Sequence, residues 1–317
     1  MDSEQITRGL CLNVLVTGSS GFIGSKFVRV LRAQGFNVFC LIRAESNRSE
    51  LGIHTLVLEE NSVAGFESAL TEEFDYIFNL AAYGVGRLDQ DMDKMFASNV
   101  SFLSNLLRSL SYKPKLVINV GSCAEYGILE ENILVDEDRV LAPTNLYGAM
   151  KSSSTLINTQ LAKDKGFPLI NIRLFGVFGE GEAEHRLMPY LISRLDADLP
   201  VELTSGQQQR DLLYIDDVIS AFLAVFENTE KLLEHDIYNV CSGVPVKVKD
   251  YVNFVAIRLN KSLDLLQWGK VVRSDEPTWV VGSNERFRSC TGWEPKFSME
   301  AGLAKAIDEY RQRSLKH

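Results

Sequence analysis

The chain has 317 residues, and its 45% hydrophobic and 24% charged side chains are typical of a globular protein and exclude a low-complexity one. The 33 basic and 42 acidic residues give a formal net charge of −9, which disfavours binding to nucleic acid or an anionic membrane. The sequence shows neither a membrane-spanning apolar run nor a secretory signal, so we expect a cytoplasmic protein.

The cysteines and histidines do not indicate a metal centre. The five cysteines include no Cys-x-x-Cys pair, and the four histidines are scattered without ligand spacing. We therefore expect reduced thiols, no bound metal and no histidine-based catalytic triad.

Short apolar runs alternate with helical patterns through the first half of the chain. This alternation predicts an α/β fold with a doubly wound parallel sheet of the Rossmann type. The expected elements are a strand at 11–17, a helix from Phe22, strands at 37–42, 54–60 and 75–82, a helix at 91–110, a strand at 115–122, a helix at 145–165 and a strand at 168–176.

Beyond Gly176 the pattern loosens into mixed helices and short strands, and it ends in a helix expected over 298–313. We therefore expect a first domain over residues 1–176 that holds the parallel sheet. A smaller mixed α/β lobe over 177–317 would mainly bind substrate, with some of its segments returning to the first domain.

The segment TGSSGFIG places Gly18, Gly21 and Gly24 between the first strand and the first helix. The first glycine permits a tight turn, the second lets the backbone approach a pyrophosphate, and the third allows close helix packing. The alternative is a plain glycine turn. The remaining cofactor contacts that we expect are Ser20, Phe22 and Ile23 in the turn and Leu80, Ala81 and Ala82 after the strand at 75–82.

The end of the second strand favours NADP(H) over NAD(H). Where an acidic residue would select NAD, the chain has Ile42 followed by Arg43, with Arg48 as a second candidate contact. A charge-assisted bond from Arg43 to a 2′-phosphate is worth about 1.5 to 3 kcal/mol. If Arg43 is instead a solvated cation paired with Glu45, NAD(H) remains the alternative.

The segment NLYGAMKSS places Tyr147 four residues before Lys151, so the two side chains share one helix face. A nearby ammonium stabilises a phenolate and makes the phenol usable as an acid–base group. The preceding strand ends at Ser122, whose hydroxyl is placed to bind the substrate oxygen that Tyr147 protonates. The alternative is that all three residues are structural.

The motifs TGSSGFIG, GSCAEYG, YGAMK, RLFGVFG and RDLLYIDDV occur in this order, and with them the chain resembles the extended short-chain dehydrogenase/reductases, specifically their nucleotide-sugar epimerase/dehydratase group. The resemblance implies a Rossmann domain holding NAD(P), a lobe binding a nucleoside-diphosphate sugar, chemistry at the sugar's C4, and a homodimer formed through two long helices. Tyr147 would be the acid–base, Lys151 its electrostatic partner and Ser122 the substrate clamp.

Departures from the family pattern narrow the reaction. Sugar 4,6-dehydratases of the family carry an Asp-Glu pair where this chain has Cys123 and Ala124, so water elimination lacks its groups. Arg43, GSCAEYG and Gly176 in RLFGVFG favour a reductase of 4-keto-6-deoxy nucleotide sugars. The alternatives are a 4-epimerase with tightly held NAD and a regulator that binds NADP without catalysis.

Similarity to the family also suggests residues that contact the substrate. Arg210 and Arg273 would bind its diphosphate, although Arg210 paired with Asp211, and Arg273 as a surface cation, are the structural alternatives. The remaining candidates are Glu276 for the ribose and Tyr83, Cys123 and Glu125 for the sugar pocket.

Overall fold

The computed structural model describes residues 12–44, 46, 54–86, 89–273 and 277–314. These residues divide into two compact units. Unit 1 holds the described residues of 1–127, 141–173 and 225–238, and unit 2 holds those of 128–140, 174–224 and 239–317. The chain passes from unit 1 to unit 2 three times, after Gly127, Arg173 and Tyr238, and the single boundary expected at Gly176 stays a prediction.

The core of unit 1 is a sheet that has seven strands among the described residues, in the order β10-β6-β5-β4-β1-β2-β3. β1 pairs in parallel with β2 and β4, β2 with β3, and β4 with β5, so the predicted α/β fold of the Rossmann type is confirmed. The strands are β1 (Asn13–Thr17), β2 (Asn37–Arg43), β3 (Thr55–Leu58), β4 (Tyr76–Asn79), β5 (Leu116–Ser122), β6 (Leu169–Leu174) and β10 (Ile237–Val240).

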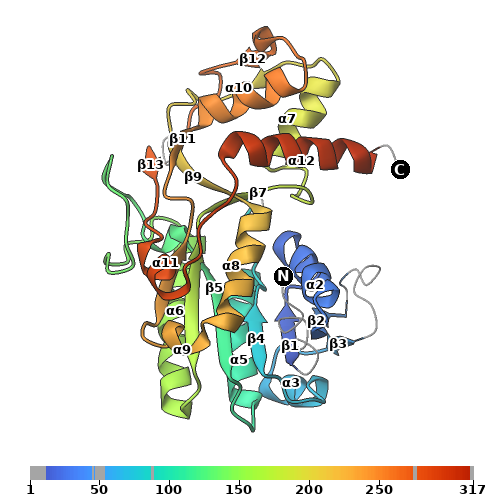
Figure 1. Ribbon diagram of the computed structural model, residues 1–317, viewed down its shortest axis with the longest axis vertical. Helices are drawn as coiled ribbons and strands as arrows, with labels where there is room; N and C mark the ends of the chain where they lie inside the picture. Colours follow the sequence, from blue (N-terminus) through green and yellow to red (C-terminus); the bar gives the residue numbers. More distant parts are fainter. Residues whose placement is uncertain (1–11, 45, 47–53, 87–88, 274–276, 315–317) are drawn as a thin grey trace. The chain divides into compact units, whose positions relative to one another are not determined.

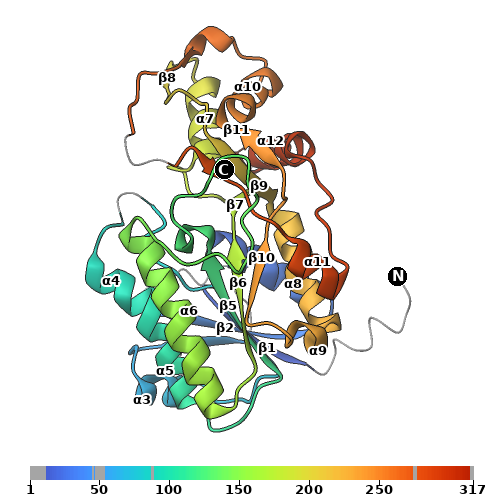
Figure 2. The same cartoon turned by 90° about the vertical axis from the view of Figure 1, so that its left-hand side faces the viewer.

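Helices connect these strands. α2 (Phe22–Ala33) follows β1, α3 (Val63–Ala69) follows β3, α6 (Leu146–Lys165) lies between β5 and β6, and the short α9 (Thr229–Leu232) precedes β10. Strand order reverses at β1, so right-handed crossovers on its two sides place their helices on opposite faces of the sheet. Figure 2 shows α5 and α6 side by side against one of these faces.

The helix expected over 91–110 is interrupted. It consists of α4 (Met92–Phe96), a π-helical turn η1 (Ala97–Ser101) and α5 (Phe102–Ser109). Asn99 in this turn is buried, and its amide nitrogen donates to the carbonyls of Met95 and Tyr83 while its oxygen accepts from the Tyr83 N–H. The interruption therefore coincides with a buried amide that binds backbone outside the helix, which periodicity alone does not reveal.

Unit 2 contains a small sheet and several helices (Figure 1). Its strands are β7 (Gly176–Phe178), β9 (Gln209–Tyr214), β11 (Pro245–Lys247) and β13 (Trp279–Val280), with β8 (Val201–Glu202) and β12 (Leu266–Gln267) as a separate pair. Its helices are α7 (Leu187–Asp196), α8 (Ile215–Glu227), which ends in unit 1, α10 (Val248–Arg258), α11 (Glu285–Thr291) and α12 (Met299–Ser314).

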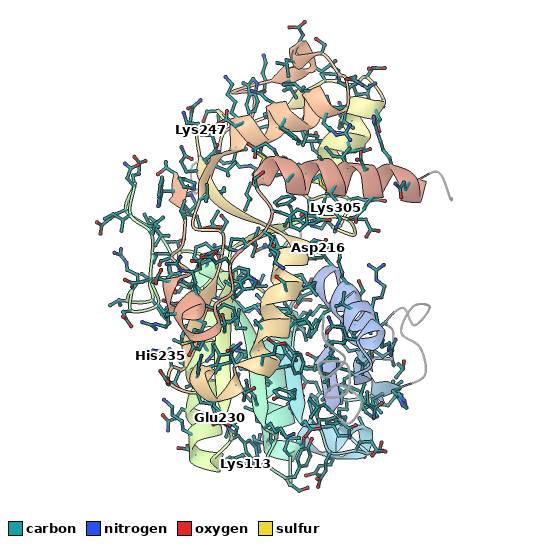
Figure 3. The ribbon with its side chains drawn as sticks, viewed as in Figure 1. Lys113, Asp216, Glu230, His235, Lys247 and Lys305 are labelled. Atoms are coloured by element: carbon teal, nitrogen blue, oxygen red, sulfur yellow. The ribbon has the colours of Figure 1, made fainter. Side chains whose placement is uncertain are left out.

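Two features stabilise unit 2. The expected final helix is present as α12, and its Lys305 forms a 2.6 Å ion pair with Asp216 of α8. Both residues are labelled in Figure 3. The segment 128–140 is bound to the same unit, because the Ile133 carbonyl accepts from the Trp279 indole and Val135 bridges to Gly282. In the part of the chain that the structure describes, no helix is both long and apolar enough to cross a membrane.

Candidate functional site

The predicted glycine turn lies between β1 and α2, and the neighbouring backbone leaves no room for a Cβ at Gly18 or Gly24. Gly18 has φ +63°, and a Cβ there would lie 2.6 Å from the Leu80 carbonyl carbon. A Cβ on Gly24 would lie 2.2 Å from the Gly18 carbonyl oxygen. Gly21 is the N-cap of α2, which has no side-chain cap and no acidic residue in its first turn. The turn therefore fits a dinucleotide pyrophosphate, because helix N–H groups are left for an anion.

A row of buried polar side chains connects this turn to the rest of the sheet. The Thr17 hydroxyl donates to Asn79, the Asn79 amide to Asn119, and the Asn119 amide to Asn171, at 2.7 to 3.0 Å. The Ala81 N–H donates to the same Thr17 hydroxyl at 3.3 Å. The row crosses β1, β4, β5 and β6, and through Thr17 it binds the backbone of the expected cofactor segment 80–82, a contact that sequence reasoning missed.

Arg43 is the last residue of β2, the position that contacts the adenosine ribose in this fold. Its side chain is exposed, whereas Ile42 is buried. The expected second contact, Arg48, and the alternative partner Glu45 lie outside the described residues, as does Glu276. The preference for NADP(H) remains a prediction.

The structure brings the expected catalytic residues to one end of β5. Ser122 ends this strand, and the Lys151 ammonium donates a 2.9 Å hydrogen bond to the Val120 carbonyl two residues earlier. Tyr147 lies one turn before Lys151 on α6 and is half-buried. Gly148 permits this packing, because a Cβ there would lie 2.4 Å from the Ala124 carbonyl oxygen.

Two features of this group bear on the predicted proton transfer. Burial lowers the pKa of Lys151 to about 8, while the negative charge of Glu125 acts in the opposite direction. The Ser122 hydroxyl oxygen accepts from the Ala124 N–H at 3.2 Å, so its own proton is available to a substrate oxygen. The arrangement suits protonation of a carbonyl oxygen by a phenol.

The structure corrects the expectation for Glu125. Its side chain is completely buried, and it forms a 2.9 Å ion pair with Arg173 of β6. A carboxylate held in this way does not line a sugar pocket in this structure. The physical reason is the 3₁₀ turn η2 (Cys123–Glu125), whose capping box turns the side chain of Glu125 back toward the Ser122 N–H. Cys123 in the same turn is partly exposed.

Tyr83, the other expected sugar contact of unit 1, is half-buried, and both of its backbone polar groups bind Asn99. Its position after β4 is therefore fixed by the π-helical turn. Leu80, Ala81 and Ala82 precede it, with Ala82 exposed.

Unit 2 holds the two arginines expected to bind a diphosphate. Arg210 on β9 is half-buried and donates to the Gln209 carbonyl at 2.9 Å. The carboxylate of Asp211 binds the N–H groups of Ser242, Gly243 and Gly282. The structural alternative for Arg210 was a pair with Asp211, and the carboxylate of Asp211 accepts hydrogen bonds from three backbone N–H groups.

Arg273 lines a pocket of about 340 Å³ in unit 2. Most of the other lining side chains are uncharged and polar, Glu131 supplies a carboxylate, and Trp279 is largely buried. The lining residues are Glu131, Asn132, Ser205, Gln207, Gln208, Gln209, Arg273, Thr278 and Trp279. One cation, Arg273, and one carboxylate, Glu131, among hydrogen-bonding side chains suit a polar ligand. No group of three or more metal-ligating side chains is found among the described residues.

A doubly wound sheet with this glycine turn defines a dinucleotide-binding protein of the Rossmann type. Residues 14–241 match the NAD dependent epimerase/dehydratase family, so the chain belongs to that family. Membership supports an NAD(P)-dependent oxidoreductase of the extended short-chain dehydrogenase/reductase type, with a nicotinamide dinucleotide as cofactor.

Two curated relatives match over nearly their whole length. The chain is 24% identical to CDP-abequose synthase of Salmonella typhimurium, over 93% of this chain and 97% of the relative. It is 25% identical to GDP-6-deoxy-D-mannose reductase of Pseudomonas aeruginosa, over 95% and 97%.

Solved structures share the fold. UDP-glucose 4-epimerase of Thermotoga maritima with UDP-glucose superposes with a TM-score of 0.85 at 22% identity, covering 96% of this chain and 100% of that one. RMD of Pseudomonas aeruginosa with NADPH superposes with a TM-score of 0.79 at 23% identity, covering 95% and 99%. At these identities the likeness establishes the fold.

Proposed function

We propose that the protein is an NADPH-dependent reductase of the C4 ketone of a nucleoside-diphosphate 4-keto-6-deoxyhexose. The observation that carries this proposal is the hydrogen bond from Lys151 to the Val120 carbonyl. It fixes the face of α6 that bears Tyr147 and Lys151 against the strand that ends at Ser122. A phenol, an ammonium and a hydroxyl are the groups that ketone reduction requires of the protein.

Each residue has a defined role. When bound, the reduced nicotinamide supplies the hydride that forms the new C4–H bond. The Ser122 hydroxyl donates a hydrogen bond to the ketone oxygen and orients it. Tyr147 transfers its phenolic proton to that oxygen as the C=O double bond becomes a single bond. The Lys151 ammonium stabilises the resulting phenolate, which solvent then reprotonates.

Reduction is favoured over water elimination. Elimination needs a base for the C5 proton and an acid for the C6 hydroxyl, and Cys123 and Ala124 occupy the positions where the family's dehydratases carry carboxylates. The nearest carboxylate in sequence, Glu125, is buried and paired with Arg173. Relatives named CDP-abequose synthase and GDP-6-deoxy-D-mannose reductase support the same choice.

Arg43 supports NADPH as the cofactor. It is exposed at the end of β2 and follows a buried apolar residue, so a 2′-phosphate meets a cation where a carboxylate would repel it. A freely exchanging NADPH suits a reductase, whereas the rival 4-epimerase would retain NAD through its cycle.

Arg210 and Arg273 would bind the substrate's diphosphate. Arg273 opens onto the polar pocket of unit 2, whose uncharged side chains offer hydrogen bonds to the rest of the ligand. These assignments require no nucleic acid or membrane partner.

A homodimer is also part of the proposal. Large apolar side chains are exposed on α4 and α6, namely Met92 and Phe96 on the first helix and Leu156 and Ile157 on the second. α4 and α6 are in contact, and a second copy of this face would cover these side chains. Size-exclusion chromatography with light scattering would report a monomer for Leu156→Glu if this face forms the dimer.

The direct test measures NADPH oxidation with a panel of nucleoside-diphosphate 4-keto-6-deoxyhexoses, and mass spectrometry confirms that the product carries two added hydrogens. Tyr147→Phe should keep cofactor affinity but lose turnover by about a thousandfold or more, because the proton donor is removed. Tyr190→Phe, at an exposed tyrosine of α7, is the matched control. Normal turnover by Tyr147→Phe would remove this residue from the mechanism.

The same preparations separate the rivals. A 4-epimerase would release stoichiometric NAD on denaturation and interconvert nucleotide sugars without added reductant. A regulator would bind NADPH yet oxidise none with any keto-sugar of the panel.

A further inference from the structure

The carboxylate of Glu125 connects three elements of unit 1. Its Oε1 accepts from the Ser122 N–H at the end of β5, at 2.9 Å. Its Oε2 accepts from Arg173 Nε of β6 and from the Thr155 hydroxyl of α6, each at 2.9 Å. The Arg173 and Glu125 side chains are 1% and 0% exposed, so the pair is fully removed from water.

This carboxylate lies against the expected catalytic residues. On α6, Thr155 is one turn after Lys151, which is one turn after Tyr147. A Cβ on Gly121 would lie 2.4 Å from Glu125 Oε1, so the carboxylate packs against the backbone immediately before Ser122. Glu125 is therefore placed to influence all three groups, although its hydrogen bonds keep it from touching substrate.

Other charged and titratable groups surround the pair. η2 and its C-cap contribute Cys123 and Tyr126, and the Arg173 guanidinium lies 4.6 Å from the centre of the Tyr126 ring. α6 contributes Tyr147 and Lys151, while β5 between Leu116 and Ser122 contributes no titratable side chain. Charges interact strongly here because little water screens them.

We propose, on the basis of the function proposed above, that Glu125 and Arg173 form a positioning unit that orients Ser122 and sets how readily Tyr147 releases its proton. Glu125 opposes deprotonation of Lys151 and Tyr147, and Arg173 counterbalances it. The negative charge of Glu125 raises the pKa of Lys151 against the effect of burial, which is the expected direction. Arg173 and Thr155 thereby acquire a role that their sequence positions did not indicate.

The test is the pH dependence of kcat/KM for keto-sugar reduction. Tyr147 must be protonated to act as the acid, so activity falls at high pH as its proton is lost. Glu125→Gln removes a negative charge while keeping the shape of the side chain. Because that charge favours the protonated forms of Tyr147 and Lys151, both residues should lose their protons more readily in the variant. The alkaline limb should therefore move by about one pH unit toward lower pH.

Arg173→Gln leaves the Glu125 charge uncompensated, so the limb should move by about one pH unit toward higher pH. The double variant replaces the pair by neutral groups, and its limb should return close to the wild-type position. Because each single variant leaves one buried charge unpaired, either can fail to fold. In that case the double variant decides the test. If the alkaline limb of its pH profile differs from that of the wild type by about a full pH unit, the charges of Glu125 and Arg173 do not compensate each other.

Thr155→Val is the matched control, because it removes one hydrogen bond to Glu125 and leaves every charge in place. Its limb should coincide with that of the wild type. A loss of activity in Glu125→Gln that is equal at every pH would overturn the proposal and leave the pair with a structural role only.

A second measurement separates this proposal from the proposed function. The phenolate absorbance of Tyr147, taken as the difference between titrations with and without Tyr147→Phe, reports its ionisation without any substrate. If no keto-sugar is reduced, the reductase assignment fails, and the shift of this absorbance in Glu125→Gln still decides whether the pair acts on Tyr147. If the phenolate absorbance is unshifted in Glu125→Gln, the inference about the pair is refuted and the proposed function is unaffected.

Discussion

The buried ammonium of Lys151 makes the stability of the protein depend on pH in a way that a single substitution can reveal. Burial lowers the pKa of Lys151 from 10.5 to about 8. A gap of about 2.5 pH units corresponds to about 3 kcal/mol, which is the cost of keeping the charged form inside the folded protein near neutral pH. Lys151→Met removes that cost together with the hydrogen bond to Val120.

The sign follows from proton binding. Because the pKa of Lys151 is lower in the folded protein, the unfolded chain binds more protons between about pH 8 and 10.5, and stability rises with pH in that window. The free-energy cost of burying the charged Lys151 is fully present below about pH 8 and disappears toward pH 10.5. From about pH 7 to about pH 9, the free energy of unfolding of the wild type should therefore gain about 1 kcal/mol relative to Lys151→Met.

Urea unfolding followed by circular dichroism at several pH values measures this difference. The absolute effect of Lys151→Met also includes an unsatisfied Val120 carbonyl, so the change of the difference with pH is the informative quantity. Lys113→Met, which replaces an exposed lysine (Figure 3), controls for the loss of one lysine elsewhere. If the free energy of unfolding depends on pH in the same way for wild type and Lys151→Met, the claim that Lys151 is a buried ammonium is refuted.

Three further substitutions test the binding residues. Gly18→Ala should weaken NADPH binding more than tenfold in a fluorescence titration, because its Cβ would meet the Leu80 backbone at 2.6 Å. Gly269→Ala, with similar φ but open space around it, should cost only about 1 kcal/mol of stability and keep binding. Arg43→Ala should reduce the preference for NADPH over NADH in steady-state kinetics by about ten- to a hundredfold, and an unchanged ratio would disprove the contact. Arg273→Ala should weaken nucleoside-diphosphate binding about tenfold by calorimetry, whereas the exposed Lys270→Ala should not; equal affinities would exclude the pocket.

The sheet and the glycine turn could be predicted because their signals are local. Parallel strands covered on both faces appear as apolar runs, and the turn after β1 needs glycine at Gly18 whatever follows. The helix over 145–165 was likewise predicted within one residue, and its N-cap Asn145 accepts from the Gly148 N–H.

The remaining features depend on contacts between distant segments. Nothing near Asn99 in the sequence indicates that it binds the backbone of Tyr83 across the π-helical turn. Residues 128–140 belong to unit 2, where the Ile133 carbonyl accepts from the Trp279 indole and Val135 bridges to Gly282, in each case across more than a hundred residues of sequence. Glu125 was misinterpreted for the same reason, because its partner Arg173 belongs to the next strand of the sheet.

The charges buried around the end of β5 favour the proposed role of Tyr147 as the acid. Lys151 and Arg173 are cations and Glu125 is an anion, so this group carries one net positive charge before the reaction. When Tyr147 gives up its proton, the phenolate brings the local sum to zero, which is the state that a poorly solvated region favours. An Asp-Glu pair in place of Cys123 and Ala124 would add two negative charges beside the phenolate and cancel this advantage. The same electrostatic balance that suits proton donation by Tyr147 therefore disfavours the carboxylates that water elimination needs.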